Sequence, residues 1–166
     1  MGGLMFRSAP APEVTGSLRA ALGRMATSVT VATTRHDSVD YGFTANSFTS
    51  VSADPALVAV FLADTADSYD AFQASEAVAI NILADGHGDL ARRFATKGVD
   101  KFSTFSAHPD YPHLPVLADA MASLITRVDS RVTMGDHLML LLAVEEVCVS
   151  ERAPLVYQDR TFRSIA

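Results

Sequence analysis

The chain has 166 residues, of which 49% are apolar, and this suits one soluble domain with a buried core. Its 13 basic and 19 acidic residues give a net charge of -6, which argues against nucleic acid and anionic membrane surfaces as partners. Cys148 is the only cysteine, which excludes an intrachain disulfide and fits a reducing cytoplasm. With neither a signal-peptide pattern nor a run of about 20 apolar residues, the sequence predicts a cytoplasmic protein that does not enter a membrane.

The first residues predict a lead-in followed by a short helix. Residues 1–14, in which Ala and Pro alternate, are expected to be a loosely ordered segment, and residues 15–166 a single domain. Apolar residues recur at helical spacing from Leu18 to Met25, behind Ser17 as a candidate N-cap.

The next segments predict strands. Residues 28–34 read SVTVATT, and the turn-like RHDSVD at 35–40 leads into YGFTANSFTSVS at 41–52, which is a hairpin pattern. Residues 56–62, ALVAVFL, are continuously apolar, as in a strand that is buried on both faces. Asp54 and Pro55 mark the turn before this strand.

The second half alternates short helices, strands and one long loop. Helices are expected near 67–75 and 89–95, with the strand AVAINIL at 77–83 between them. Residues 106–117 contain three prolines and predict an irregular loop. Two strands follow around Met134, Gly135 and Asp136, and residues 154–165 predict a last hairpin. Many closely spaced strands favour a mainly β fold, a β-barrel with peripheral helices, over a parallel α/β sheet.

The stretch TANSFTSVS at 44–52 is unusually rich in uncharged polar side chains. If it forms one strand, alternation places Thr44, Asn46, Phe48, Ser50 and Ser52 on one face. Hydroxyl and amide groups suit the edge of a flat heteroaromatic ring with alternating carbonyl and nitrogen atoms, and they also suit phosphate oxygens. A solvent-facing polar strand is the alternative, and composition alone favours it.

These residues resemble a known family. The run TANSFTSVSADPALVAVFL, followed by INIL, RFA, DKF and GDH in that order, is similar to the flavin reductase-like family with the FMN-binding split-barrel fold. The resemblance extends from about Leu18 to Arg163. It implies a short reductase that reduces FMN or FAD with NADH or NADPH and supplies the reduced flavin to a separate monooxygenase.

The resemblance also implies site residues. Flavin contacts would fall on Thr44, Ala45, Asn46 and Ser47, on Ser50, Val51 and Ser52, on Asn81 and Leu83, and on Lys101 and Phe102. The histidine of the GDH motif, His137, would lie near the nicotinamide and act in catalysis. Tyr157 and Arg163 are weaker candidates that would reach the nicotinamide nucleotide across a subunit boundary.

The residues also allow other roles. His137 could be an ordinary turn residue; in the functional role, its neutral imidazole would donate a hydrogen bond to the carboxamide or to charge developing on the flavin. Lys101 could be a surface lysine, with Arg92 and Arg93 as competing partners of the flavin phosphate. Asn81 is equally a pocket wall or a backbone tie, because a buried amide must be hydrogen-bonded. His87, His108 and His113 are scattered in loops with no carboxylate or cysteine at the spacing of metal ligands, so no metal site is predicted.

Hydride transfer between a nicotinamide and a flavin needs no protein nucleophile. The sequence fits this, because it has no GxSxG, HExxH, Walker or GxGxxG motif. The apolar runs ALVAVFL and LMLLLAV exceed what a small barrel with a wet outer face needs, which predicts a homodimer with the flavin sites at or beside the interface. The functional alternatives are a flavin carrier or sensor without turnover, and a split-barrel enzyme that keeps its flavin and acts on another small molecule.

Overall fold

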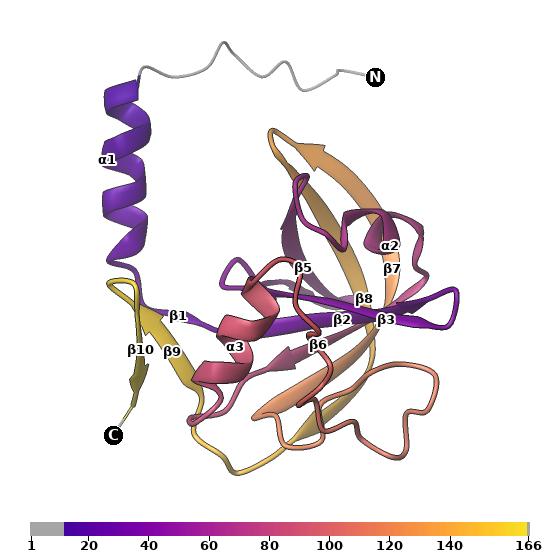
Figure 1. Ribbon diagram of the computed structural model, residues 1–166. Helices are drawn as coiled ribbons and strands as arrows, with labels where there is room; N and C mark the ends of the chain where they lie inside the picture. The colour runs from indigo at the N-terminus through magenta and orange to yellow at the C-terminus, as the bar shows by residue number, and fades with distance from the viewer. Residues whose placement is uncertain (1–11, 166) are drawn as a thin grey trace.

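The computed structural model describes residues 12–165 and shows a mainly β molecule built around one strongly curved sheet (Figure 1). The seven strands of this sheet lie in the order β3-β2-β6-β7-β8-β5-β4, and all neighbours are antiparallel. In chain order the strands are β2 (Thr30–His36), β3 (Val39–Ala45), β4 (Thr49–Ala53), β5 (Ala56–Ala63), β6 (Ala77–Ile82), β7 (Ala122–Met134) and β8 (His137–Val149). This arrangement confirms the predicted split barrel with peripheral helices.

A second, three-stranded sheet lies beside the barrel. It consists of β1 (Thr27–Ser28), β9 (Leu155–Gln158) and β10 (Thr161–Ser164), with β9 in the middle. The predicted strand over 28–34 is therefore interrupted at Val29, so that β1 pairs with the terminal hairpin and β2 enters the barrel. The predicted hairpins at 134–136 and 154–165 are both present.

The segment 44–52 is not one strand, and the predicted alternation along it is wrong. β3 ends at Ala45 and β4 begins at Thr49, and these strands form opposite edges of the seven-stranded sheet. The chain thus leaves one edge and joins the other within a few residues, which brings the end of β3 close to β5. We call the place where these two edges approach each other the seam of the barrel. An edge strand has one side without a neighbouring strand, so backbone N–H and C=O groups of β3 and β4 are available there for hydrogen bonds.

Residues 12–165 include three helices: α1 (Pro12–Gly23), α2 (Tyr69–Ala74) and α3 (Gly88–Ala95). Among residues 12–165, no helix combines the length and the hydropathy that a membrane span requires. The first helix begins well before the predicted Leu18, because Pro12 suits the first turn of a helix and Glu13 favours its positive end. The predicted lead-in thus lies largely outside the described residues, and its last three residues, 12–14, are helical.

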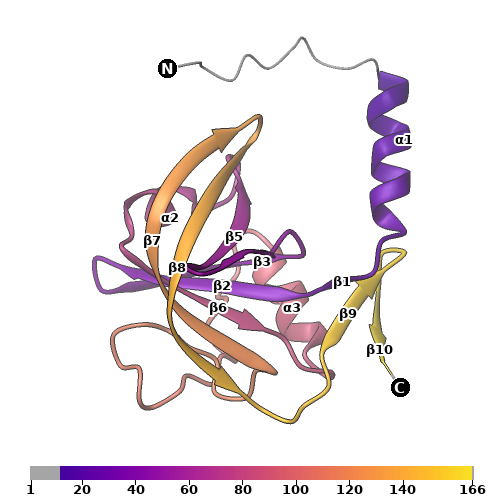
Figure 2. The same cartoon turned by 180° about the vertical axis from the view of Figure 1, so that it is seen from behind.

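Helix α1 stands away from the barrel in both views (Figures 1 and 2). None of its residues is buried, and its apolar side chains recur on one face: Val14, Leu18 and Leu22 in the helix and Met25 after it are each more than half exposed. Its end is fastened to the β9–β10 hairpin, because the Asp159 N–H donates to the Gly23 carbonyl at 2.8 Å.

An ion-pair cluster secures the start of α3. Asp119 Oδ2 lies 3.1 Å from His87 Nε2 and 3.2 Å from Arg152 Nη1, which joins the β6–α3, 106–121 and β8–β9 connections. Burial raises the pKa of Asp119, but the hydrogen bond from His87 and the charges of His87 and Arg152 outweigh it and hold the pKa below its usual value. The cluster therefore stabilises the loop that begins α3.

Candidate functional site

A cavity of about 320 Å³ opens at the seam of the barrel. We call it the seam pocket; its walls come from the end of β3, the end of β5, the last turn of α3, the 97–101 loop and the start of β8. The predicted residues that line it are Thr44, Ala45, Asn46, Ser47, Lys101 and His137. Residues distant in sequence thus meet around one cavity.

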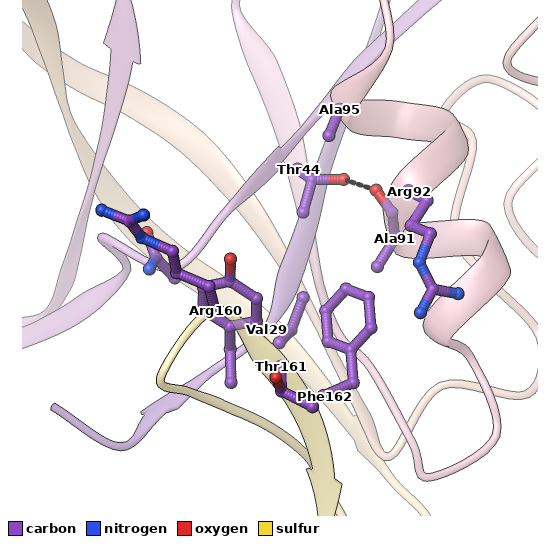
Figure 3. A pocket seen from close by; sticks show the side chains of 10 residues that line it. Val29, Thr44, Ala91, Arg92, Ala95, Arg160, Thr161 and Phe162 are labelled. Atoms are coloured by element: carbon purple, nitrogen blue, oxygen red, sulfur yellow. Dashed lines mark hydrogen bonds between the residues drawn. The ribbon is translucent and has the colours of Figure 1, made fainter. Parts of the chain in front are cut away.

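Two hydroxyl groups that line the seam pocket already have acceptors. Thr44 Oγ1 donates to the Ala91 carbonyl at 2.7 Å (Figure 3), and Ser47 Oγ donates to the Phe61 carbonyl at 3.3 Å. These hydroxyls therefore offer lone pairs to a ligand rather than protons. Within residues 12–165 the Asn46 amide makes no hydrogen bond, so that it can both donate and accept.

Two lysines give the seam pocket a positive wall. Lys101 Nζ donates to the Gly42 carbonyl at 3.1 Å, and Lys97 Nζ donates to the Thr65 carbonyl at 2.5 Å. Burial lowers the pKa of Lys101, and the positive charge of Lys97 lowers it further. The negative charge of Asp67 raises this pKa and so offsets part of the shift. Lys101 forms no ion pair with a described residue, and a half-buried ammonium of this kind is a ready partner for an anionic group.

His137 is held by its neighbour. Its Nδ1 lies 2.7 Å from Asp136 Oδ1, and this hydrogen bond, together with a backbone hydrogen bond and the charge of His137, lowers the pKa of Asp136. An ionised carboxylate only accepts, so Nδ1 carries the proton. In the neutral ring, Nε2 is therefore a hydrogen-bond acceptor. The sequence analysis expected the imidazole to act as a donor.

A larger cavity of about 640 Å³ adjoins the seam pocket. We call it the hairpin pocket, because its outer wall is the β9–β10 hairpin, with Tyr157, Arg160, Thr161 and Phe162 (Figure 3). The two cavities share the lining residues Thr44, Asn46 and Ala95. Arg92, rather than Arg93, lines the hairpin pocket; Arg93 donates to Ser103 and to the Asp100 carbonyl.

Several predicted flavin contacts lie elsewhere. Asn81 is fully buried and ties the core together through the Val31 carbonyl, the Leu117 N–H and the hydroxyls of Thr33 and Ser123. It is therefore a backbone tie, and Leu83 is likewise buried in the core.

The other displaced candidates are on β4, in the loops and in the hairpin. Ser50, Val51 and Ser52 lie on edge strand β4 and line neither cavity. Phe102 packs edge-on against Phe94 with ring centroids 5.1 Å apart and borders a different, smaller cavity. Tyr157 lines the hairpin pocket. Arg163 does not line it, and its Nη2 lies 4.0 Å from Asp159 Oδ2.

The sequence reasoning missed some lining residues. Phe61 and Lys97 line the seam pocket, and Arg160 and Phe162 line the hairpin pocket. The four-residue spacing of Lys97 and Lys101 was an available signal for the positive wall. An arginine in the two-residue turn of the last hairpin, where glycine is usual, was another.

Known proteins resemble this chain over most of its length. It is 40% identical over 153 residues to a Streptomyces coelicolor protein named actinorhodin polyketide dimerase, covering 90% of this chain and 86% of that protein. It is 35% identical over 144 residues to the reductase component of 4-nitrophenol 4-monooxygenase/4-nitrocatechol 2-monooxygenase from Rhodococcus opacus, covering 87% and 77%.

A solved structure shares the fold. The NADH:FAD oxidoreductase SgcE6 of Streptomyces globisporus C-1027, in complex with NAD and FAD fragments, superposes with a TM-score of 0.86 at 30% identity, covering 96% of this chain and 98% of that one. The model of the flavin reductase like domain matches residues 22–166. These matches, together with the split barrel and its seam pocket, show that the chain belongs to the flavin reductase-like family.

Proposed function

We propose that this chain is an NAD(P)H-dependent flavin reductase whose seam pocket holds FMN or the flavin half of FAD. The observation that carries the proposal is the convergence of Thr44–Ser47, Lys101 and His137 on one cavity in a chain of this family. Lys101 and Lys97 would hold the flavin phosphate, since the cavity is otherwise lined by uncharged polar and apolar side chains apart from Asp67 and His137. The lone pairs of the Thr44 and Ser47 hydroxyl oxygens, together with the amide of Asn46, would orient the edge of the flavin ring.

A flavin held by these residues would supply the redox chemistry of the site, because it can accept a hydride from reduced nicotinamide together with a proton from water. His137 would orient the nicotinamide by accepting a hydrogen bond from its carboxamide N–H₂ at Nε2. Asp136 would keep the ring in the tautomer that this requires.

A turnover assay tests the proposal. Purified protein is mixed with NADH or NADPH and with free FMN or FAD, and the loss of nicotinamide absorbance is followed. Reduction of many flavin molecules per protein supports a reductase, whereas a yellow protein without turnover would make it a carrier. A protein that turns over once and keeps its flavin would be an enzyme acting on another small molecule.

The role of His137 is tested separately. His137→Ala should lower kcat about 10-fold or more, through lost orientation, with a smaller change in flavin affinity. His36→Ala is the matched control, because His36 also neighbours an aspartate at a strand end but lines neither cavity. Equal losses of kcat and flavin affinity in His137→Ala would reject the assigned role.

We further propose that the chain forms a homodimer. The outward side chains of Phe61, Met139 and Leu141 on β5 and β8 are only half-buried, and helix α1 has its own exposed apolar face. A lone 12-residue helix is marginally stable in water, so a surface that covers it is expected. In a two-fold dimer each copy supplies both surfaces to the other, and Phe61 connects this face to the seam pocket.

The reduced flavin would pass to a separate monooxygenase, as the name of the Rhodococcus opacus relative suggests for that protein. Release requires weak binding of the product, which the open seam favours. We propose a cytoplasmic location because reduced nicotinamide is supplied there. The protein should lose its flavin on dialysis, and retention of stoichiometric flavin would argue against transfer.

A further inference from the structure

The two lysines of the seam pocket lie on a loop that is tied to the opposite side of the pocket. Lys97 and Lys101 are the only lysines of the chain. Lys97 Nζ donates to the Thr65 carbonyl at 2.5 Å, and the Gly98 N–H donates to Asp67 Oδ2 at 3.1 Å. These two hydrogen bonds, which we call the loop latch, join the loop after α3 to the connection between β5 and α2. The latch therefore fixes the segment that carries both ammonium groups.

The backbone of this loop depends on the latch at Gly98. This residue has φ 70°, in the left-handed region that glycine adopts readily. Apart from its chain neighbours, no described residue comes within 4 Å of the place where a Cβ would lie. Packing thus does not hold the turn, and the hydrogen bond to Asp67 is the contact that fixes its position.

Asp67 also acts on Lys101 through its charge. Both residues line the seam pocket and the smaller cavity of about 270 Å³ that Phe102 borders. Within residues 12–165, neither residue takes part in an ion pair. The charge of Asp67 nevertheless raises the pKa of Lys101 against the effect of burial. Asp67 therefore favours the charged form of Lys101 while leaving its ammonium group available to a ligand.

The other ionisable groups that face Lys101 are engaged elsewhere or act in the opposite direction. They are Asp40, Tyr41 and Asp100 in the smaller cavity, and Lys97 and His137 in the seam pocket. Asp40 pairs with Arg35 at 2.5 Å, and Asp100 Oδ1 accepts from the Phe102 N–H at 3.1 Å. Among the carboxylates, Asp67 has the strongest effect on Lys101.

From these contacts we propose that Asp67 is a positioning residue for the flavin phosphate, because it fixes the loop of the two lysines and supports the positive charge of Lys101. This rests on the proposed function, in which Lys101 contacts that phosphate. A carboxylate repels a phosphate, so Asp67 acts through the lysines and does not itself bind the flavin.

The effect of the Asp67 charge is measured without flavin. The full chain is prepared with isotopically labelled lysine, and the Cε resonances are followed by NMR as pH rises, with Lys97→Arg identifying the resonance of Lys101. In Asp67→Asn this resonance should titrate at lower pH than in the unmodified chain, because a charge that favours the ammonium is lost. An unchanged titration would overturn the proposal.

Asp70→Asn is the matched control for the charge. Asp70 lies in the first turn of α2, three positions after Asp67, and lines neither the seam pocket nor the smaller cavity. The titration of Lys101 in this variant should match that of the unmodified chain. An equal displacement in Asp70→Asn and Asp67→Asn would show a general charge effect and reject the role of Asp67.

The effect of the latch is measured by comparing Asp67→Ala with Asp67→Asn. Both variants lack the charge, but only the asparagine keeps an oxygen that can accept from the Gly98 N–H. In fluorescence titrations at neutral pH, the alanine variant should bind FMN about 3- to 10-fold more weakly than the asparagine variant, from the loss of one hydrogen bond. Riboflavin, which lacks the phosphate, should bind both variants equally.

The same titrations separate this inference from the proposed function. If FMN binds the unmodified chain no more tightly than riboflavin, the phosphate contact of Lys101 is wrong and the role of Asp67 is rejected with it. If FMN binds more tightly than riboflavin but the two Asp67 variants bind FMN equally, or lose riboflavin as much as FMN, only the role of Asp67 is rejected.

Discussion

Gly42 on β3 lies where the barrel wall meets α3, and its substitution tests how tightly the seam pocket is packed. A Cβ atom at this position would lie 2.6 Å from Phe94 Cε1 and 3.0 Å from the Ala32 carbonyl oxygen. Phe94 has almost no freedom to yield, because it is 1% exposed and packs against Phe102 and Phe105. Gly42→Ala must therefore displace the ring or the strand.

The cost follows from the overpacking. Adding a buried methyl group to a filled core typically costs about 1–3 kcal/mol. At about 2–4 °C per kcal/mol for a chain of this size, Tm should fall by about 2–12 °C. The pocket should also deform, because Phe94 lines it and the Gly42 carbonyl accepts the hydrogen bond from Lys101. We expect KM for flavin to rise several-fold.

Thermal unfolding followed by circular dichroism, with steady-state kinetics on the same samples, measures both effects. Gly16→Ala is the matched control, because a Cβ there meets nothing within 4 Å and the residue lies inside helix α1. That variant should be more stable by up to about 1 kcal/mol. A Gly42→Ala protein with unchanged Tm and KM would refute the packing described around the seam.

Further outcomes are expected at other sites. Lys101→Met should weaken flavin binding about 10-fold in a fluorescence titration, since a charge-assisted contact is lost, and an unchanged Kd would remove Lys101 from the site. Because burial lowers the pKa of Lys101 and an anion binds its protonated form, flavin affinity should fall as pH rises through a pKa below 10.5, and a flat profile to that pH would contradict this. Leu18→Asp should raise the dimer Kd about 10-fold or more in analytical ultracentrifugation, whereas Ala20→Asp on the opposite face of α1 should not, and an unmodified chain that is monomeric at micromolar concentration would end the dimer proposal. The folded-state pKa of Asp119 lies below 3.8, so its contribution to stability is complete above that pH and is lost as pH falls through the folded pKa; Asp119→Asn should abolish this part of the acid dependence in urea titrations, and an identical slope in both proteins would contradict it.

The sequence predicted most of the strands correctly, because each of them is marked by residues that are neighbours in the chain. The apolar run of β5, the long hairpin of β7 and β8 and the terminal hairpin each combine strand formers with a short turn. The break between Ala45 and Thr49 could not be read in this way. It exists because the chain must cross the seam, which is a tertiary requirement that polar alternation does not encode.

The lining of the seam pocket was predictable where its residues are consecutive in the sequence. It was less predictable where tertiary packing determines whether a side chain faces the pocket or the core. Thr44–Ser47 reach the cavity as expected, but Asn81 does not, since an amide among apolar neighbours serves a core network as well as a pocket. Helix α1 begins before the predicted Leu18, because a proline that is typical of a loose segment also suits the first turn of a helix, as Pro12 does here. Arg160 was not predicted to line a cavity, because its place beside the hairpin pocket depends on the geometry of the β9–β10 turn.

A crystal structure of the protein with FMN would show whether the polar residues after Phe43 hold a flavin. We expect the isoalloxazine to lie in the seam pocket, with its ring edge at hydrogen-bond distance from Thr44–Ser47 and its phosphate near Lys101. A flavin bound along β4, or anywhere that leaves the seam pocket filled only with water, would contradict it.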